Sequence, residues 1–263
     1  MSDAGDFYVG YLRTPRRIAL FLWWFVPTLI LAMLGLGWYV SGSQSNPGDG
    51  VWHEDSATYV GQIGATPYPH VRLPTNRPDR PIETILLVSE GKHGAGARTR
   101  SLAGQIVRVR GTLLERDGVR LLELAGDESV TPGGTLSSAD AARLARTEAG
   151  KRHASPQRIT LRGEIIDPKC YSGAMKPGEG KAHKECATLC IAGGIPPMFV
   201  TVDGAGKRVY FLLTDRAGRA LDGDVLRERV LPFVADAVEI TGELEIRDDL
   251  TLFRIDPTSI RRL

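Results

Sequence analysis

Two matching stretches decide the fold: V-R-V-R-G-T-L-L-E-R-D-G-V-R-L-L-E-L at 107–124 and V-E-I-T-G-E-L-E-I-R-D-D-L-T-L-F-R-I at 238–255. In each, apolar and polar residues alternate around a glycine, and an R-D-G or R-D-D turn leads into a second alternating run. Alternation with a period of two is typical of half-buried strands, and a glycine inside such a run indicates a bend of the kind that closes small barrels. Each stretch therefore predicts a β-hairpin. The pair indicates an internal duplication, although two unrelated hairpins can share this pattern.

The second hairpin closes a longer series of predicted elements. A further copy of the phrase, I-T-L-R-G-E-I at 159–165, precedes strands expected at 198–202 and 208–213. A helix expected across 221–234 follows, and the hairpin at 238–255 ends the series. Three strands, a helix and two strands is the order of an OB-fold barrel.

The whole chain is expected to be a mostly β protein with an anchor and two small barrels. A first OB-like unit is predicted at 55–126, from strands near 57–62 and 84–89 and the first hairpin, and a second at 157–263. The Ser-, Ala- and Gly-rich stretch 127–156 predicts a linker with one short helix, A-D-A-A-R-L-A-R-T-E.

The N-terminal part predicts a transmembrane helix. The run I-A-L-F-L-W-W-F-V-P-T-L-I-L-A-M-L-G-L-G-W-Y-V at 18–40 has 23 residues and no charged side chain, enough to cross a hydrocarbon core of ~30 Å. A cleaved signal peptide is the rival interpretation, because a small-residue V-S-G sequence ends the run. Such peptides have apolar cores of only roughly 7 to 15 residues, so we favour an uncleaved anchor.

The charges beside this run predict its orientation. The basic residues before it are Arg13, Arg16 and Arg17. No lysine or arginine occurs in 41–71. The positive-inside rule then assigns 1–17 to the cytoplasm and makes 41–54 a linker on the outer side of the membrane.

Composition excludes several function classes. A net charge of +2, with 24% charged residues spread along the chain, provides no basic stripe for the phosphates of a nucleic acid. The G-E-G-K sequence at 178–181 is not a phosphate-binding loop, so no nucleotide is expected. No nucleophile elbow or zinc-protease motif occurs, and we expect no catalytic residue.

Every cysteine lies in a Gly- and Pro-rich insert at 167–197, which occupies the loop between the first two strands of the second barrel. This loop is a customary binding loop of OB folds. The candidate metal ligands in it are Cys170, Met175, His183, Cys186 and Cys190.

The spacing of these residues favours one metal site. A short helix is expected to end at the G-G of 193–194, and it would carry His183, Cys186 and Cys190 at i, i+3 and i+7 on one face. Cys170 comes from the end of the preceding strand. Thiolates and imidazole suit zinc or copper, and thioethers such as Met175 and Met198 favour copper, because soft sulfur binds Cu(I).

Two other interpretations of the cysteines stay open. A structural disulfide would join Cys170 to Cys186 or Cys190, because one helical turn places the latter two poorly for a bond. Alternatively, Cys186 and Cys190 would carry out thiol–disulfide exchange with Cys170 as the resolving thiol.

The insert also resembles a known phrase. K-C-Y-x-G-x-M-K-P-G-x-G-K-x-H-x-x-C-A-x-x-C-I-x-G-G-I-P-P, at 169–197, is similar to a stretch shared by an uncharacterised family of bacterial membrane-anchored proteins. The resemblance implies a location in the bacterial envelope and implies no activity.

Taken together, these patterns predict a single-pass protein of the bacterial inner membrane with its barrels in the periplasm. We expect a non-catalytic accessory factor or small subunit of a membrane-bound oxidoreductase complex, with copper or zinc in the insert. A thiol–disulfide redox protein and a disulfide-stapled interaction domain are the alternatives.

Overall fold

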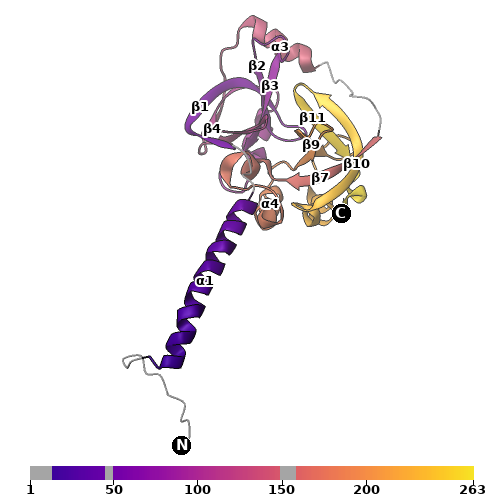
Figure 1. Cartoon of the computed structure of the whole chain (residues 1–263). Coiled ribbons are helices and arrows are strands. Elements are labelled where there is room, and N and C mark those ends of the chain that lie inside the picture. The colour runs from indigo at the N-terminus through magenta and orange to yellow at the C-terminus, as the bar shows by residue number, and fades with distance from the viewer. Residues whose placement is uncertain (1–13, 45–49, 149–157) are drawn as a thin grey trace, which may run out of the picture. The chain divides into compact units, whose positions relative to one another are not determined.

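The computed structural model of the chain describes residues 14–44, 50–148 and 158–263 (Figure 1). It divides into two compact units, Met1–Asn46 and Pro47–Leu263. Arg13, most of the predicted cytoplasmic segment and parts of both predicted linkers lie outside the described residues.

The first unit contains one long helix, α1 (Arg16–Ser43), which covers the predicted span. Its 28 residues measure ~42 Å, and an 18-residue window has a mean hydropathy of 2.2. Pro27 leaves one backbone carbonyl of the helix without its usual donor, and Thr28 Oγ1 donates to the neighbouring carbonyl of Trp24 at 2.7 Å. Among the described residues, α1 is the one helix long and apolar enough to cross a membrane.

The second unit begins with a closed five-stranded barrel. Its strands are β1 (Val51–Gly64), β2 (His70–Pro74), β3 (Ile82–Val88), β4 (Ile106–Arg116) and β5 (Val119–Leu124). They pair in the order β1-β2-β3-β5-β4 and close through β4 on β1, with β3 parallel to β5. Helix α2 (Gly96–Thr99) and the 3-10 turn η1 (Arg100–Leu102) connect β3 to β4. This is the OB topology. Strand β2 was not predicted, and β1 begins at Val51, earlier than the strand expected near 57–62.

The second barrel repeats this topology. Its strands are β7 (Arg158–Ile166), β8 (Met198–Val202), β9 (Arg208–Thr214), β10 (Ala237–Arg247) and β11 (Leu250–Ile255). They pair in the order β7-β8-β9-β11-β10, β10 closes on β7, and β9 runs parallel to β11. The prediction of a mostly β fold with an N-terminal apolar helix and small barrels is therefore confirmed.

Three short additions complete the barrels. Strand β6 (Val130–Pro132) extends the first sheet beside β4, and η5 (Pro257–Ser259) and β12 (Arg261–Arg262) follow β11. The helix expected across 221–234 is shorter: α5 (Gly223–Arg229) gives way to the 3-10 turn η4 (Leu231–Phe233). Pro232 explains this break, because its ring clashes with the carbonyl four residues earlier and it has no N–H to donate.

The glycines of the repeated phrase lie where strands cross closely. A Cβ added at Gly111, Gly163 or Gly242 would come closer than 3.0 Å to a backbone oxygen of the adjacent strand. Each position therefore needs a residue without a side chain, and this lets the long strands β4, β7 and β10 bend around their barrels.

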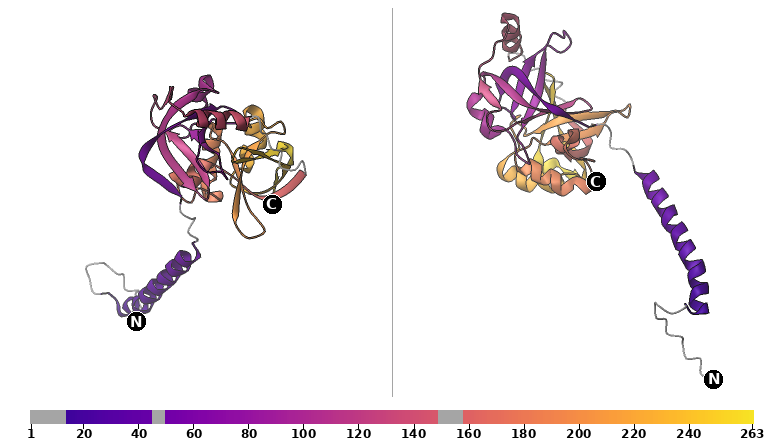
Figure 2. Two further views of the ribbon diagram at one scale, coloured as in Figure 1. Left: turned by 90° about the horizontal axis from the view of Figure 1, so that it is seen from above. Right: turned by 90° about the vertical axis from the view of Figure 1, so that its left-hand side faces the viewer.

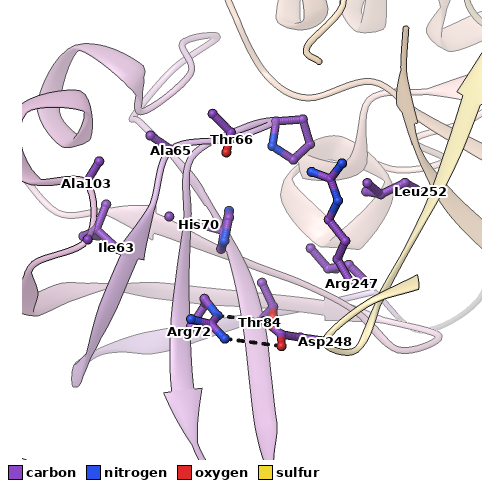
Figure 3. Close-up of a pocket in the computed structure, with 14 residues that line it drawn as sticks. Ile63, Ala65, Thr66, His70, Arg72, Thr84, Ala103, Arg247, Asp248 and Leu252 are labelled. Atoms are coloured by element: carbon purple, nitrogen blue, oxygen red, sulfur yellow. Dashed lines mark hydrogen bonds and ion pairs between the residues drawn. The ribbon is translucent and has the colours of Figure 1, made fainter. Parts of the chain in front are cut away.

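The two barrels lie against each other (Figure 2). They share a core and exchange hairpin turns, so that the turn of each barrel contacts the other. Asp117, in the β4–β5 turn, accepts hydrogen bonds from Tyr171 and Tyr210 of the second barrel at 3.1 and 2.9 Å. Asp248, in the matching β10–β11 turn, pairs with Arg72 of the first barrel at 2.7 Å (Figure 3). Both aspartates have positive φ, near 50°, as two-residue hairpin turns require.

The stretch between the barrels packs more closely than a simple linker would. Helix α3 (Ser138–Glu148) covers the predicted short helix. Its Leu144 is 2% exposed, and Arg143 donates to the backbone oxygen of Thr75 at 3.1 Å, next to the end of β2.

Candidate metal centre

The insert between β7 and β8 folds into three short helical pieces: the π-turn η2 (Cys170–Ala174), the 3-10 turn η3 (Lys181–His183) and helix α4 (Lys184–Ala192). Helix α4 ends at the two glycines that the sequence analysis identified. Gly194 has φ 97°, and the amide of Ile195 donates to the Cys190 oxygen at 3.1 Å, which closes the helix end.

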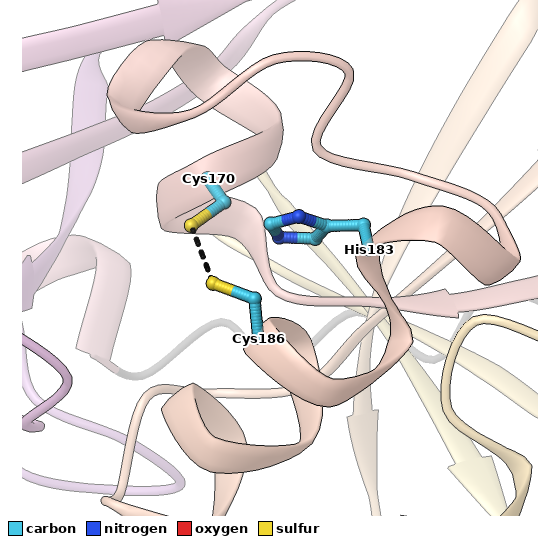
Figure 4. A group of neighbouring side chains, drawn as sticks. All are labelled: Cys170, His183 and Cys186. Carbon is cyan, nitrogen blue, oxygen red and sulfur yellow. Dashed lines mark hydrogen bonds between the residues drawn. The ribbon is translucent and has the colours of Figure 1, made fainter.

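The side chains of three predicted ligands, Cys170, His183 and Cys186, point toward one another within this insert (Figure 4). The Sγ atoms of Cys170 and Cys186 lie 3.9 Å apart, and a ring nitrogen of His183 lies within 4.8 Å of both. The thioether Sδ of Met175 lies 3.8 Å from Cys186 Sγ. His183 ends η3 and immediately precedes α4, so it still reaches the same face as Cys186, one turn later.

Cys190 takes part in a different group from the one expected. Its Sγ lies within 4.8 Å of Cys170 Sγ and of a carboxylate oxygen of Asp167, and all three residues are buried. Asp167 was not among the predicted ligands. Its position in D-P-K-C, just after a strand and three residues before a cysteine, was the available signal. Met198, named as a second thioether, lies instead in the core between the barrels, 5% exposed.

The first barrel supplies one wall of the site. Lys92 Nζ donates to Cys186 Sγ at 2.8 Å and to Cys190 Sγ at 3.7 Å. The amide of Gly94 donates to the Gly193 oxygen at 3.0 Å, and these two backbones approach so closely that neither glycine has room for a side chain. The loop at 89–98 is therefore part of the site.

A buried lysine holds that loop in place. Lys169 Nζ lies 3.0 Å from the carboxylate of Glu123 and donates to the oxygens of Ser89 and Gly91 at 3.0 and 2.6 Å. Lys169 is adjacent to Cys170 in the sequence. One short segment therefore provides both a candidate ligand and the side chain that holds the loop at 89–98.

The acid–base properties of the cluster differ from residue to residue. A hydrogen bond with Cys190, burial and the charge of Asp167 raise the pKa of Cys170. The same contact with Cys170 lowers the pKa of Cys190. Burial lowers the pKa of His183, which keeps the ring neutral near pH 7, and its Nε2 is buried without a hydrogen-bond partner. A neutral ring with a free nitrogen is the form that binds a metal.

A cavity of about 350 Å³ between the barrels is a weaker candidate for a functional site than the cysteine cluster, because its charged side chains already have partners (Figure 3). Arg72 and Asp248 line it but pair with each other, and His70 Nδ1 is hydrogen-bonded to the Tyr68 oxygen at 2.8 Å. Its polar groups therefore serve the contact between barrels.

Comparison of the chain with protein-family models, with curated proteins and with solved structures gives no match. All three cysteines are free thiols in the structure. Two thiols, an imidazole and a thioether within a few ångströms can bind a transition metal, and two thiols 3.9 Å apart can form a disulfide after a small movement.

Proposed function

We propose that this protein is a membrane-anchored metal-binding accessory protein that holds zinc or copper in the insert of its second barrel. Cys170, His183 and Cys186 are the ligands, and Met175 is the fourth. The convergence of these donors carries the proposal. A tetrahedral site with metal–sulfur bonds of about 2.3 Å has sulfur–sulfur edges of about 3.8 Å. The two sulfur separations at Cys186, 3.9 and 3.8 Å, match this value.

The exposure of the ligands supports transfer of the metal to a partner. Cys170 and His183 are buried, whereas Met175 is 48% exposed and Cys186 is intermediate. A site with one exposed thioether keeps a side open to an incoming ligand, as a carrier requires. A closed structural site would surround the ion with buried donors.

The location follows from the anchor and its flanking charges. Arg16 and Arg17 open α1, and 41–71 has no basic residue, which supports an N-terminus in the cytoplasm and barrels in the periplasm of a bacterial inner membrane. A tethered metal carrier can serve only targets within its reach. We therefore propose a membrane-bound oxidoreductase complex as the partner, with this protein as assembly factor or small subunit.

Metal content of the full-length protein tests this function. The chain is extracted from membranes in detergent and purified without chelator. Bound metals are measured by mass spectrometry, and free thiols are counted in denaturant. We expect at least one zinc or copper per chain and three titratable thiols. Cys186→Ser should lose one metal ion per chain on dialysis, whereas Leu189→Ala, an exposed change on the same helix, should retain it.

Thiol–disulfide exchange is the second candidate, favoured by the Lys92 contact. Lys92 Nζ lies 2.8 Å from Cys186 Sγ, where an ammonium group can donate to this sulfur when it attacks a partner disulfide. Cys170 Sγ lies 3.9 Å from Cys186 Sγ, so this pair would form the bond and pass two electrons and two protons to a partner disulfide. Absence of metal with three free thiols, and slower alkylation of Cys186 in Lys92→Met, would favour this function. Absence of metal with a single free thiol would instead indicate a disulfide-stapled interaction domain.

A further inference from the structure

We propose that the insert holds two metal ions, and that Cys170 bridges them. The inference rests on the proposed function and adds a second, inner position formed by Asp167, Cys170 and Cys190. The outer position is the one described above, with His183 and Cys186.

The donor atoms form two groups that meet at one sulfur. Cys170 Sγ lies within 4.8 Å of the donors of His183 and Cys186 on one side, and of Asp167 and Cys190 on the other. Thiolate sulfur has enough lone pairs to bind two metal ions, and each bond of about 2.3 Å leaves room for the remaining donors of that ion at these separations. Cys170 is therefore the one residue that serves both groups.

The inner group contains a polar atom that needs a partner. Asp167 is 0% exposed, and its Oδ1 accepts from the Lys169 amide at 2.9 Å. Its Oδ2 is buried with no hydrogen-bond partner. A buried carboxylate oxygen without a donor costs free energy of folding, and buried charges are normally paired or coordinate a metal. The neighbouring ammonium of Lys169 cannot supply the charge, because it is held by Glu123 and two backbone oxygens.

The chemistry of the inner donors indicates the kind of ion. Two thiolates and a carboxylate suit a borderline divalent ion such as Zn²⁺, which accepts both oxygen and sulfur, better than they suit Cu(I), which prefers sulfur alone. The inner position has no exposed donor, since Cys190 is 1% exposed. It is suited to retaining its ion, whereas the outer position is suited to exchange.

Zinc stoichiometry of the full chain tests the inner position. Metal-stripped protein in detergent is titrated with Zn²⁺ against a chromophoric chelator, and the bound zinc is counted by mass spectrometry. We expect two Zn²⁺ per chain. Asp167→Asn keeps the shape and the Oδ1 acceptor, and it should bind one. Cys190→Ala should also bind one, Cys170→Ser should lose both, and the buried control Ser172→Ala should keep both.

Cobalt provides a second readout specific to the bridge. Two high-spin Co²⁺ ions joined by a thiolate couple magnetically, so the second equivalent should reduce the electron paramagnetic resonance signal, whereas independent ions would add to it. Saturation at one Zn²⁺, unchanged in Asp167→Asn, would leave the outer site intact and refute the inner one. Two ions with additive cobalt signals would refute the bridge. No bound Zn²⁺ at all would refute both zinc positions, and the absence of copper as well would refute the metal function itself.

Discussion

Lys169 is the residue whose replacement tests most directly how the two barrels build the site. Its side chain is 5% exposed, it pairs with Glu123 at 3.0 Å, and it donates to two backbone oxygens of the loop that carries Lys92. In Lys169→Met, the carboxylate of Glu123, whose side chain is 12% exposed, loses its partner. Loss of one member of a buried pair costs about 3–5 kcal/mol. For a folded unit of this size, each kcal/mol lowers the melting temperature by roughly 2–4 °C, so we expect a fall of about 10 °C.

Thermal unfolding of the full chain in detergent, followed by far-ultraviolet circular dichroism, measures this change. The double variant Lys169→Met/Glu123→Gln removes both charges, and it should recover much of the lost stability, because the unpaired carboxylate is the main source of the cost. The single variant should also slow the alkylation of Cys186, because the loop that carries Lys92 is no longer held beside this cysteine. A loss below about 1 kcal/mol, or effects of the two changes that simply add, would refute the reasoning.

Three further outcomes follow from other parts of the fold. Asp248→Ala removes the ion pair with Arg72 between the barrels, where the two side chains are 13% and 7% exposed. It should lower the urea midpoint by an amount equivalent to about 1.5–3 kcal/mol, which is typical of hydrogen bonds to a charged group; an unchanged midpoint would contradict the role of the exchanged turns. Burial lowers the pKa of His70 below its ordinary value of 6.5. The folded state therefore resists protonation of His70. The neutral ring makes its full contribution to stability above pH 6.5, and this contribution is lost as the pH falls from 6.5 towards the lowered pKa. His70→Gln should make stability less dependent on pH between about 7 and 5, with a residual slope from buried His183, whose pKa is also lowered; equal slopes in variant and wild type would contradict this. Gly163→Ala places a Cβ closer than 3.0 Å to the adjacent strand and should cost about 1–3 kcal/mol in equilibrium unfolding, with wild-type stability as the contrary result.

The fold was largely predictable because its determinants are local. Strand alternation, the glycine inside each phrase and the R-D-G and R-D-D turns act over a few residues, and they led to both hairpins and to the order of elements in the second barrel. The error in the α5 region came from Pro232, which divides one expected helix into two pieces. Strand β2 was missed because H-V-R-L-P is short and ends in proline, a weak strand signal by itself.

The candidate site was predictable only in part. Cys170, His183 and Cys186 were identified from residue type and helical spacing, and the structure brings them together with Met175. Asp167 was overlooked, because one aspartate after a strand has no distinguishing pattern until its burial and its unpartnered oxygen are known. Met198 was named from its residue type, but its position on β8 directs it into the shared core.

By itself, the sequence determined the apolar span, the two barrel motifs and the short window that contains every cysteine, since each depends on residue type and near-neighbour spacing. Only the tertiary structure decided that Lys92 contacts Cys186 and Cys190 across more than 90 residues of chain, and that Cys190 belongs with Asp167. The physical reason is that the barrels pack through a common core and exchange hairpin turns. Side chains far apart in the chain therefore meet, and no local pattern encodes that contact.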